Sequence, residues 1–258
     1  PTGFVPEYLD LNGDGKMHCL DDFYGIVTEY NNLTSTLLLV ANGVKLCETD
    51  ADGRLAFHLD DERTVAVIDK MAKYFQKIEN NNDNTLLFDQ TFKYDRALFA
   101  IHYVESTLRR FRDMESDYAI LPFPKFDEAQ ENYSTAVHDS TTTLSIPITN
   151  IANREATCAF LEAFAAESYR TVTDVYFSTL LKEKFARDQN VDAIFDIILD
   201  GVYFDFALLH SYALDSVGQI FRTLISKGNN NFVSEYQKKA ESYDKLMEKL
   251  IEAYNQEQ

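Results

Sequence analysis

The segment Tyr118–Lys125, with the sequence YAILPFPK, limits the fold of this chain more than any other stretch. The four residues Tyr118–Leu121 predict a short apolar strand, and Pro122 and Pro124 follow directly. Each proline fixes its own φ and biases the residue before it toward an extended backbone. No helix can run through this stretch, so we expect a rigid extended crossing between two parts of the molecule.

Strands and helices alternate before this crossing. Alternating apolar residues and turn residues predict strands, and apolar residues recurring every three or four positions predict helices. We expect a helix that starts after Asp60 or Asp61, a helix ended by Gly43, and a hairpin closed by the turn 50–53. The helix that Gly43 ends covers 33–42, and the hairpin joins strands at 44–48 and 54–59. Further strands are predicted at 23–27 and 97–103, and a short basic helix around Leu108 and Phe111.

The C-terminal half reads as nearly all helical. A strand at 142–146 is closed by Pro147, and later helices are expected at 188–199 and after Gly228. The last helix carries a heptad seam, which we expect to pack on its own domain. Asn150 or Asn153 is expected to open another helix with an inward-packing face, made by Ala156, Ala159, Phe160, Ala163 and Phe164. The chain is therefore assigned to the α/β class.

Composition narrows the range of functions. The net charge is −18, from 24 basic and 42 acidic residues, which disfavours binding to nucleic acid and to anionic bilayers. Hydrophobic residues make up 45% of the chain, as in an ordinary globular protein. The spacing of Cys19, Cys47 and Cys158 fits neither a disulfide framework nor a zinc site.

The segment 10–21 has the spacing of a calcium loop. In such loops, side-chain oxygens stand at positions 1, 3 and 5, a glycine at 6, a backbone carbonyl at 7 and a carboxylate at 12. The residues at these positions are Asp10, Asn12, Asp14, Gly15, Lys16 and Asp21. Asp21 is shorter than the usual glutamate, so weak calcium binding is expected. The alternative is an ordinary Asx/Gly turn without metal.

Catalytic motifs give no support for an enzyme. Neither a G-x-S-x-G motif, a glycine-rich phosphate loop nor a metal-binding histidine spacing occurs in the sequence. Aromatic residues are more informative, with 15 tyrosines, 19 phenylalanines and no tryptophan. A tyrosine ring offers an apolar face and a polar edge, which suits a sugar.

The whole segment Leu108–Ser140, LRRFRDMESDYAILPFPKFDEAQENYSTAVHDS, resembles extracellular solute-binding proteins of bacterial ABC importers, in the carbohydrate-type family 1. In that family the LP-P-K run carries the chain between two lobes beside the ligand cleft. Further matching segments are Glu162–Tyr169, Val172-Thr173, Tyr176-Phe177, Ala186-Arg187-Asp188 and Asp205-Phe206.

The resemblance implies a periplasmic-binding-protein-like fold of type II. Residues 1–116 would form the first part of the C-terminal lobe, 117–166 the crossing with the return strand and helix of the N-terminal lobe, and 167–258 the C-terminal lobe helices. Most of the N-terminal lobe, together with a signal peptide and a lipid-anchored cysteine, would belong to a longer protein. We therefore expect an exposed apolar face along Asp117–Phe164, which the other lobe would cover.

The resemblance also implies a function and a set of ligand-binding residues. The expected protein is an extracellular, cell-surface lipoprotein of a Gram-positive bacterium, which closes two lobes on a sugar or oligosaccharide and delivers it to the permease subunits. Its membrane attachment would be the lipid anchor alone. The implied ligand-binding residues are Asn31, Asn32, His102, Tyr103, His138, Asp139, Ser140, Tyr176 and Phe177. A secreted glycoside-processing enzyme and a calcium-dependent structural or adhesion module remain as alternatives.

Overall fold

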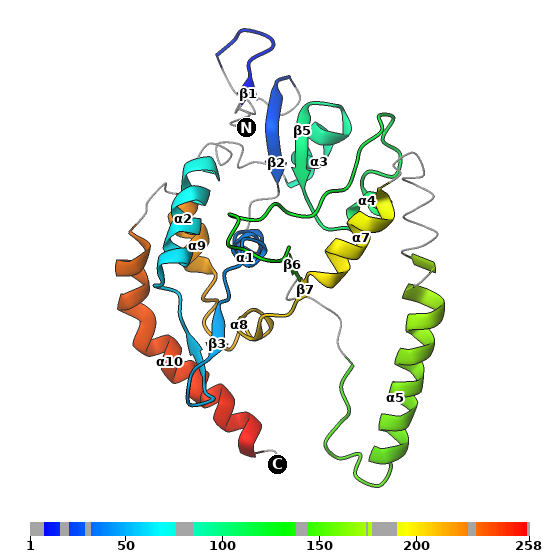
Figure 1. The fold of residues 1–258 in the computed structure, drawn as a ribbon, viewed down its shortest axis with the longest axis vertical. Coiled ribbons are helices and arrows are strands. Elements are labelled where there is room, and N and C mark those ends of the chain that lie inside the picture. Colours follow the sequence, from blue (N-terminus) through cyan, green and yellow to red (C-terminus); the bar gives the residue numbers. More distant parts are fainter. Residues whose placement is uncertain are drawn as a thin grey trace. The chain divides into compact units, whose positions relative to one another are not determined.

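The computed structural model describes residues 8–15, 21–28, 32–75, 85–137, 144–173, 175–176, 190–226 and 231–256. Helices and small sheets are mixed, which confirms the α/β class (Figure 1). The chain divides into two compact units. The first comprises Pro1–Asp117, Phe123–Asp139 and Gly201–Gln258, and the second Tyr118–Pro122 and Ser140–Asp200. The lobe boundaries at 117 and 166 and the type II arrangement stay predictions.

A three-stranded sheet in the first unit has the order β1 (Tyr8–Leu9), β2 (Phe23–Thr28), β5 (Ala97–Ile101). The β1–β2 pair is antiparallel, whereas β2 and β5 are parallel. Parallel strands need a long crossover connection, which here holds the helices between them. The predicted strands at 23–27 and 97–103 are confirmed within two residues of their ends.

Helix α1 (Asn32–Ala41) ends where Gly43 predicts. Gly43 adopts φ +80°, its N–H donates to the Val40 carbonyl at 2.9 Å, and the Val44 N–H donates to the Leu39 carbonyl at 3.1 Å. These two bonds make a Schellman motif, which satisfies carbonyls that the helix leaves open. The predicted hairpin follows as β3 (Cys47–Thr49) and β4 (Leu55–Phe57).

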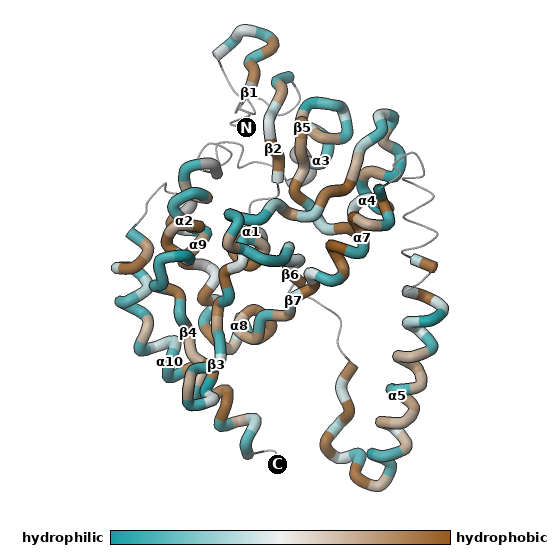
Figure 2. Tube along the Cα trace, in the orientation of Figure 1, coloured by the Kyte–Doolittle hydropathy of each residue, from teal (hydrophilic) through white to brown (hydrophobic). Residues whose placement is uncertain are grey.

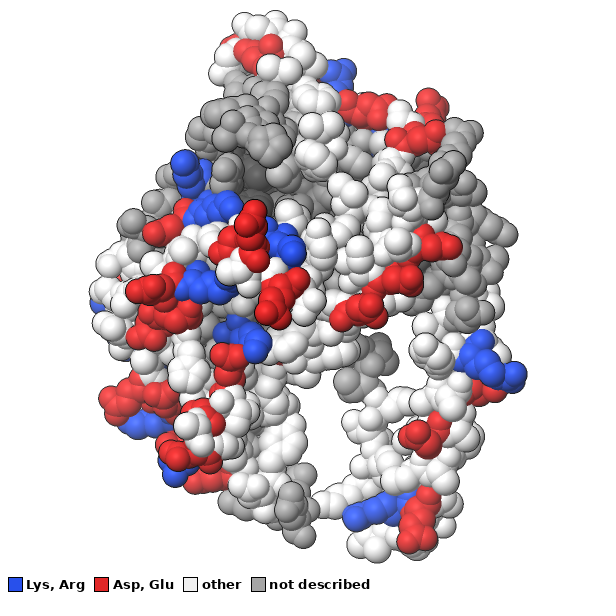
Figure 3. Space-filling view, viewed as in Figure 1, with Lys and Arg blue, Asp and Glu red and all other residues white. Residues whose placement is uncertain are grey.

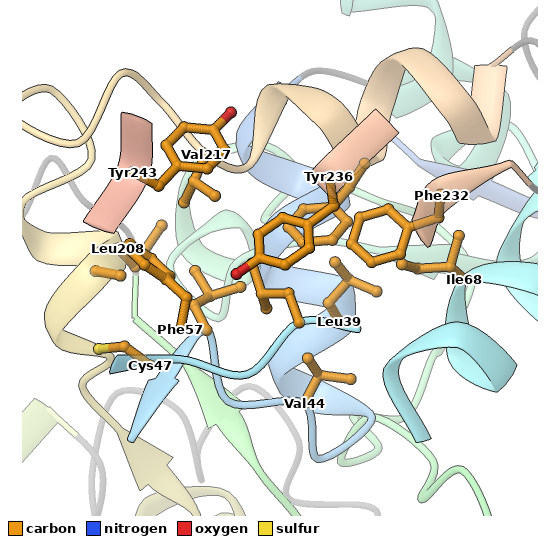
Figure 4. Close-up of a cluster of buried hydrophobic side chains, with 14 of the residues drawn as sticks. Leu39, Val44, Cys47, Phe57, Ile68, Leu208, Val217, Phe232, Tyr236 and Tyr243 are labelled. Carbon is orange, nitrogen blue, oxygen red and sulfur yellow. The ribbon is translucent and has the colours of Figure 1, made fainter. Parts of the chain in front are cut away.

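The main core of the first unit lies among α1, α2 (Glu62–Phe75), α8 (Phe206–Leu209), α9 (Gln219–Ser226) and α10 (Phe232–Gln256). Figure 4 shows aliphatic and aromatic side chains from these elements pointing toward one another. Tyr236, Tyr243 and Met247 of the heptad seam are buried in this core. The expected packing of the last helix on its own domain is therefore confirmed.

The segment after the crossing is anchored on the first unit by Gln130. Its side-chain amide donates to the Ala41 carbonyl at 3.1 Å, and its amide oxygen accepts from the Phe126 N–H at 2.9 Å. The segment then forms β6 (Thr135–Ala136), parallel to β7 (Val202–Tyr203). Tyr118–Leu121 itself makes no strand pairing, so the strand predicted there is wrong. Neither these short strands nor α3 (Thr85–Lys93) and α8 were predicted from the sequence.

The second unit contains α5 (Arg154–Ser168), a π-helical turn η2 (Tyr169–Thr173) and α7 (Val191–Asp200). Residues Leu144–Ile146 form no strand, so the described part of the strand predicted at 142–146 is wrong. Helix α5 has no buried residue, and its predicted inward face is wrong as well. Periodicity identifies an apolar stripe but not the surface that covers it.

In the stretch Asp117–Phe164, where an exposed apolar face was expected, several large apolar side chains of the second unit are exposed. These side chains are between half and three-quarters exposed, and brown apolar residues recur along this stretch and along α5 in Figure 2. Phe160 and Phe164 stack on α5 with ring centroids 6.1 Å apart. The other exposed residues of this face are Leu121, Leu144, Ile148 and Ile151.

Candidate functional site

The carboxyl ends of β2 and β5 meet at one edge of the sheet. Thr28, the last residue of β2, pairs with Ile101, the last residue of β5, and its hydroxyl donates to the Ile101 carbonyl at 3.4 Å. Asn32 begins α1 four residues after Thr28, and His102 and Tyr103 follow Ile101 directly. In open α/β sheets, ligands bind outside the carboxyl ends of the strands. We call the region around Thr28, Ile101, His102 and Tyr103 the carboxyl edge.

The His102 ring is held by hydrogen bonds on both nitrogens. Nδ1 accepts the backbone N–H of Tyr103 at 2.8 Å and lies 2.7 Å from the Ser106 hydroxyl. Nε2 lies 3.0 Å from Oδ1 of Asp89. A backbone N–H can only donate, so Nδ1 must be an acceptor and Nε2 must carry the proton of the neutral ring. Nε2–H therefore donates to Asp89.

Asp89 is fixed from two sides. His102 bonds one carboxylate oxygen, and the Arg110 guanidinium donates to the other. Burial works to raise the pKa of Asp89, but the hydrogen bonds from His102 and Arg110 outweigh burial and hold that pKa below its usual value. Asp89 therefore stays a carboxylate acceptor at neutral pH.

This cluster is enclosed. The side chain of His102 is 7% exposed and that of Asp89 is 11% exposed, while Ser106 is buried. The His102 ring also stands edge-on to Tyr103 and Phe111, with centroids 5.6 and 5.7 Å away. An acid–base or nucleophilic role needs contact with a substrate, which this enclosure does not offer. The cluster instead supports the half-buried Tyr103 at the carboxyl edge.

The described chain brings together only some of the residues that were predicted for ligand binding. His102 and Tyr103 lie at the carboxyl edge, Asn32 begins α1 four residues after Thr28, and the half-buried Tyr176 belongs to the second unit. The predictions that lie outside the described residues are Asn31, His138, Asp139, Ser140 and Phe177.

Sequence reasoning missed Asp89, Ser106 and Arg110. Asp89 lies 13 residues before His102 on a different element, and no spacing rule links the two. Ser106 and Arg110 lie four and eight residues after His102, at the start and just past the end of the short helix α4 (Ser106–Arg109), whereas His102 lies outside that helix. Only the folded chain brings these side chains to one ring.

The predicted calcium loop folds as a series of Asx turns. The Asp10 carboxylate accepts the N–H groups of Gly13 and Gly15 at 2.6 and 2.8 Å, and Asn12 Oδ1 accepts the Asp14 N–H at 2.9 Å. Gly13 and Gly15 adopt φ +75° and +72°, which favours glycine. These bonds fold residues 10–15 into consecutive tight turns.

The far end of this loop is only partly described. Lys16 lies outside the described residues, and Asp21 is exposed. The buried Asp22, which sequence reasoning passed over, accepts the Leu11 N–H at 3.0 Å and ties the loop to the start of β2. Among the described residues, no group of three or more His, Cys, Asp or Glu side chains is placed to hold a metal ion. Calcium binding stays a prediction.

No protein-family model, curated protein or solved structure matches this chain. Among the described helices, none combines the length and the apolar character that crossing a membrane requires.

Proposed function

We propose that this chain is part of the substrate-binding component of a bacterial ABC importer, which captures an extracellular sugar or oligosaccharide. The observation that carries the proposal is the carboxyl edge, where the β2–β5 register brings Thr28 beside Ile101, the residue directly before His102 and Tyr103. The Leu108–Ser140 resemblance supports it from the sequence. The proposed ligand is held without bond chemistry, by closure of two lobes.

The chemistry of the edge favours binding over turnover. Tyr103 carries an aromatic ring of the kind that stacks on the apolar face of a sugar, and its hydroxyl can exchange hydrogen bonds with sugar hydroxyls. His102 and Asp89 are engaged with each other and with neighbouring groups, which leaves them a supporting role. A sugar-binding protein needs this combination of one stacking ring and neutral polar groups.

The proposal also includes the cellular location, the partner subunits and the calcium ion that we expect from the sequence. The full protein would be a lipid-anchored protein of the cell surface that delivers its ligand to the permease subunits. We further propose that Asp10, Asn12, Asp14 and Asp21 bind calcium through side chains and Lys16 through its carbonyl. Calcium is abundant outside cells, which suits a weak extracellular site.

Thermal-shift screening and calorimetry against sugars, amino acids and peptides test this function on a two-lobed protein that contains this chain. A sugar should raise the melting temperature, and Tyr103→Ala should weaken its binding by roughly 10- to 100-fold through the loss of ring stacking. Tyr212, which is 98% exposed and lies outside the carboxyl edge, supplies the control Tyr212→Ala. Stabilisation by peptides alone, or equal effects of the two variants, would contradict the proposal.

A further inference from the structure

The end of β5 is held by a bond that depends on the protonation of one ring. The Tyr103 N–H donates to Nδ1 of His102 at 2.8 Å, and the Ser106 hydroxyl shares that acceptor at 2.7 Å. The same short segment is closed by the Ser106 N–H, which donates to the Tyr103 carbonyl at 3.0 Å. The position of Tyr103 is therefore tied to a lone pair that only neutral His102 possesses.

Asp89 keeps that lone pair on the correct nitrogen. By accepting from Nε2–H at 3.0 Å, its carboxylate selects the tautomer in which Nδ1 is free to accept. Arg110 in turn bonds Asp89 and holds its orientation. Two nearby charged pairs lie at the surface, Lys93 with Asp113 and Arg109 with Glu105.

We propose that His102 is a positioning residue for the sugar-binding edge: its neutral ring holds Tyr103 in place, and a second proton on the ring releases Tyr103. Protonation puts a hydrogen on Nδ1, which the Ser106 hydroxyl oxygen can turn to accept but the Tyr103 N–H cannot, so the contact with Tyr103 becomes one between two donors. Asp89 keeps its bond to Nε2 in both states, so the change falls on Tyr103. The inference rests on the proposed function for the ligand, but the release itself can be measured without one.

The first experiment uses the wild-type protein without ligand. Nitrogen-15 shifts of the His102 ring are followed by NMR from about pH 8 to about pH 5, the range in which histidines change charge. We expect the Nε2–H tautomer at the upper end. On protonation, the exchange protection of the Tyr103 amide should fall roughly tenfold after correction for intrinsic exchange, which is the effect of losing one hydrogen bond. An Nδ1–H tautomer, or protection unchanged by protonation, would overturn the inference.

Two variants of the same residue separate positioning from a general loss of structure. His102→Asn places an amide oxygen where Nδ1 stood, so it keeps an acceptor that does not titrate. His102→Gln places its amide near Nε2, where it can donate to Asp89, and it removes the Nδ1 acceptor of the Tyr103 N–H. Tyr103 should be protected at every pH in the first variant and at none in the second. Equal pH dependence in wild type and His102→Asn would overturn the inference, and the wild-type titration decides it if either variant fails to fold.

Sugar titrations at both pH values connect the release to binding. Wild-type affinity should fall roughly tenfold on protonation of His102, whereas His102→Asn should bind equally well at both ends of the range. A sugar that binds wild type equally at both pH values while Tyr103 is released would overturn the positioning role. Release of Tyr103 without binding of any sugar would remove the proposed function and leave the His102–Tyr103 contact established.

Discussion

The space around Gly218 has room for a glycine but not for a side chain. A Cβ atom built on Gly218 would lie 2.0 Å from the Thr36 hydroxyl oxygen and 3.2 Å from Thr36 Cβ. Gly218→Ala should therefore destabilise the protein by about 1–3 kcal/mol, the usual cost of overpacking. Urea denaturation measures this change in the free energy of unfolding.

The partner residue supplies the control for this prediction. Thr36→Ala removes the hydroxyl that the new methyl group would meet, so Gly218→Ala should cost clearly less in that background than in wild type. A double-mutant cycle isolates the coupling between the two positions. The same cost in both backgrounds would show that the clash is relieved in some other way.

The predicted calcium loop can be tested against a similar turn in the same chain. With an affinity on the order of 10⁻⁴–10⁻³ M, calcium at about 10 mM should stabilise the fold by about 1–3 kcal/mol. Melting curves with calcium and with a chelator measure the effect, and Asp14→Ala should abolish it because it removes a charged ligand.

Asp52 supplies the matched control for the calcium prediction. It lies in the Asx turn 50–54, where the Asp50 carboxylate accepts the Asp52 and Arg54 N–H groups at 2.9 and 2.8 Å. This turn lacks the ligand spacing of a calcium loop, so Asp52→Ala should keep the calcium response. If neither calcium nor a chelator changes the melting curve, the prediction of calcium binding by the segment 10–21 is wrong.

Among the helices, α7 carries an unfavourable arrangement of charge. Asp192, Asp196 and Asp200 follow one another at spacings of four, and Figure 3 shows acidic side chains in a row over α7. Like charges at this spacing destabilise a helix, and an acid in the last turn opposes the helix dipole. Asp200→Lys should therefore stabilise the protein by about 0.5–1 kcal/mol, measured by urea denaturation at low salt.

The neutral variant Asp200→Asn separates two contributions to that gain. It removes the repulsion from Asp196 but adds no cation at the helix end, so it should give a smaller part of the effect. Both gains should shrink in high salt, because exposed charges are screened. A stabilisation that is independent of salt would contradict the electrostatic explanation.

The sequence predicts best the elements whose signals are local. Helix α1 ends at Gly43 because a glycine can take the left-handed conformation there, and the β3–β4 hairpin forms around Asp50 because its carboxylate closes the turn. The crossing at Tyr118–Leu121 is extended, as Pro122 and Pro124 require, but an extended segment becomes a strand only if another strand pairs with it. That partner cannot be read from local sequence.

The candidate site was predictable to the same degree. His102 and Tyr103 were predicted at a strand end, and they follow the last residue of β5, which pairs with Thr28 at the end of β2. The hydrogen bonds that hold the His102 ring were not predictable. Asp89 bonds His102 from α3, and Arg110, which directly follows helix α4, bonds Asp89. Such contacts are made by tertiary packing, which no spacing in the sequence records.

In the molecule as a whole, the buried apolar residues are unevenly distributed. The main core belongs to the first unit, where Leu39, Ile68 and Phe221 are fully buried. Three stacked pairs extend along this core, with centroids between 5.2 and 6.3 Å apart, among Phe221, Phe232, Tyr236 and Tyr243. Burial of apolar surface dominates folding stability, so the first unit should set the global stability of this chain.

Helix α5 should accordingly be the least protected long helix. It has 15 residues and none is buried, and isolated helices of about this length are only marginally stable in water. Amide hydrogen exchange should be orders of magnitude faster in α5 than in α1, whose Leu39 and Val40 lie in the core. Repeating the measurement at tenfold higher protein concentration controls for coverage by a second copy. In a longer chain with the proposed second lobe, α5 should gain protection at every concentration, because the sheet of that lobe is proposed to cover Phe160 and Phe164. Equal protection of α5 and α1 in this chain alone, at both concentrations, would contradict the exposed face and remove the structural argument for a covering lobe.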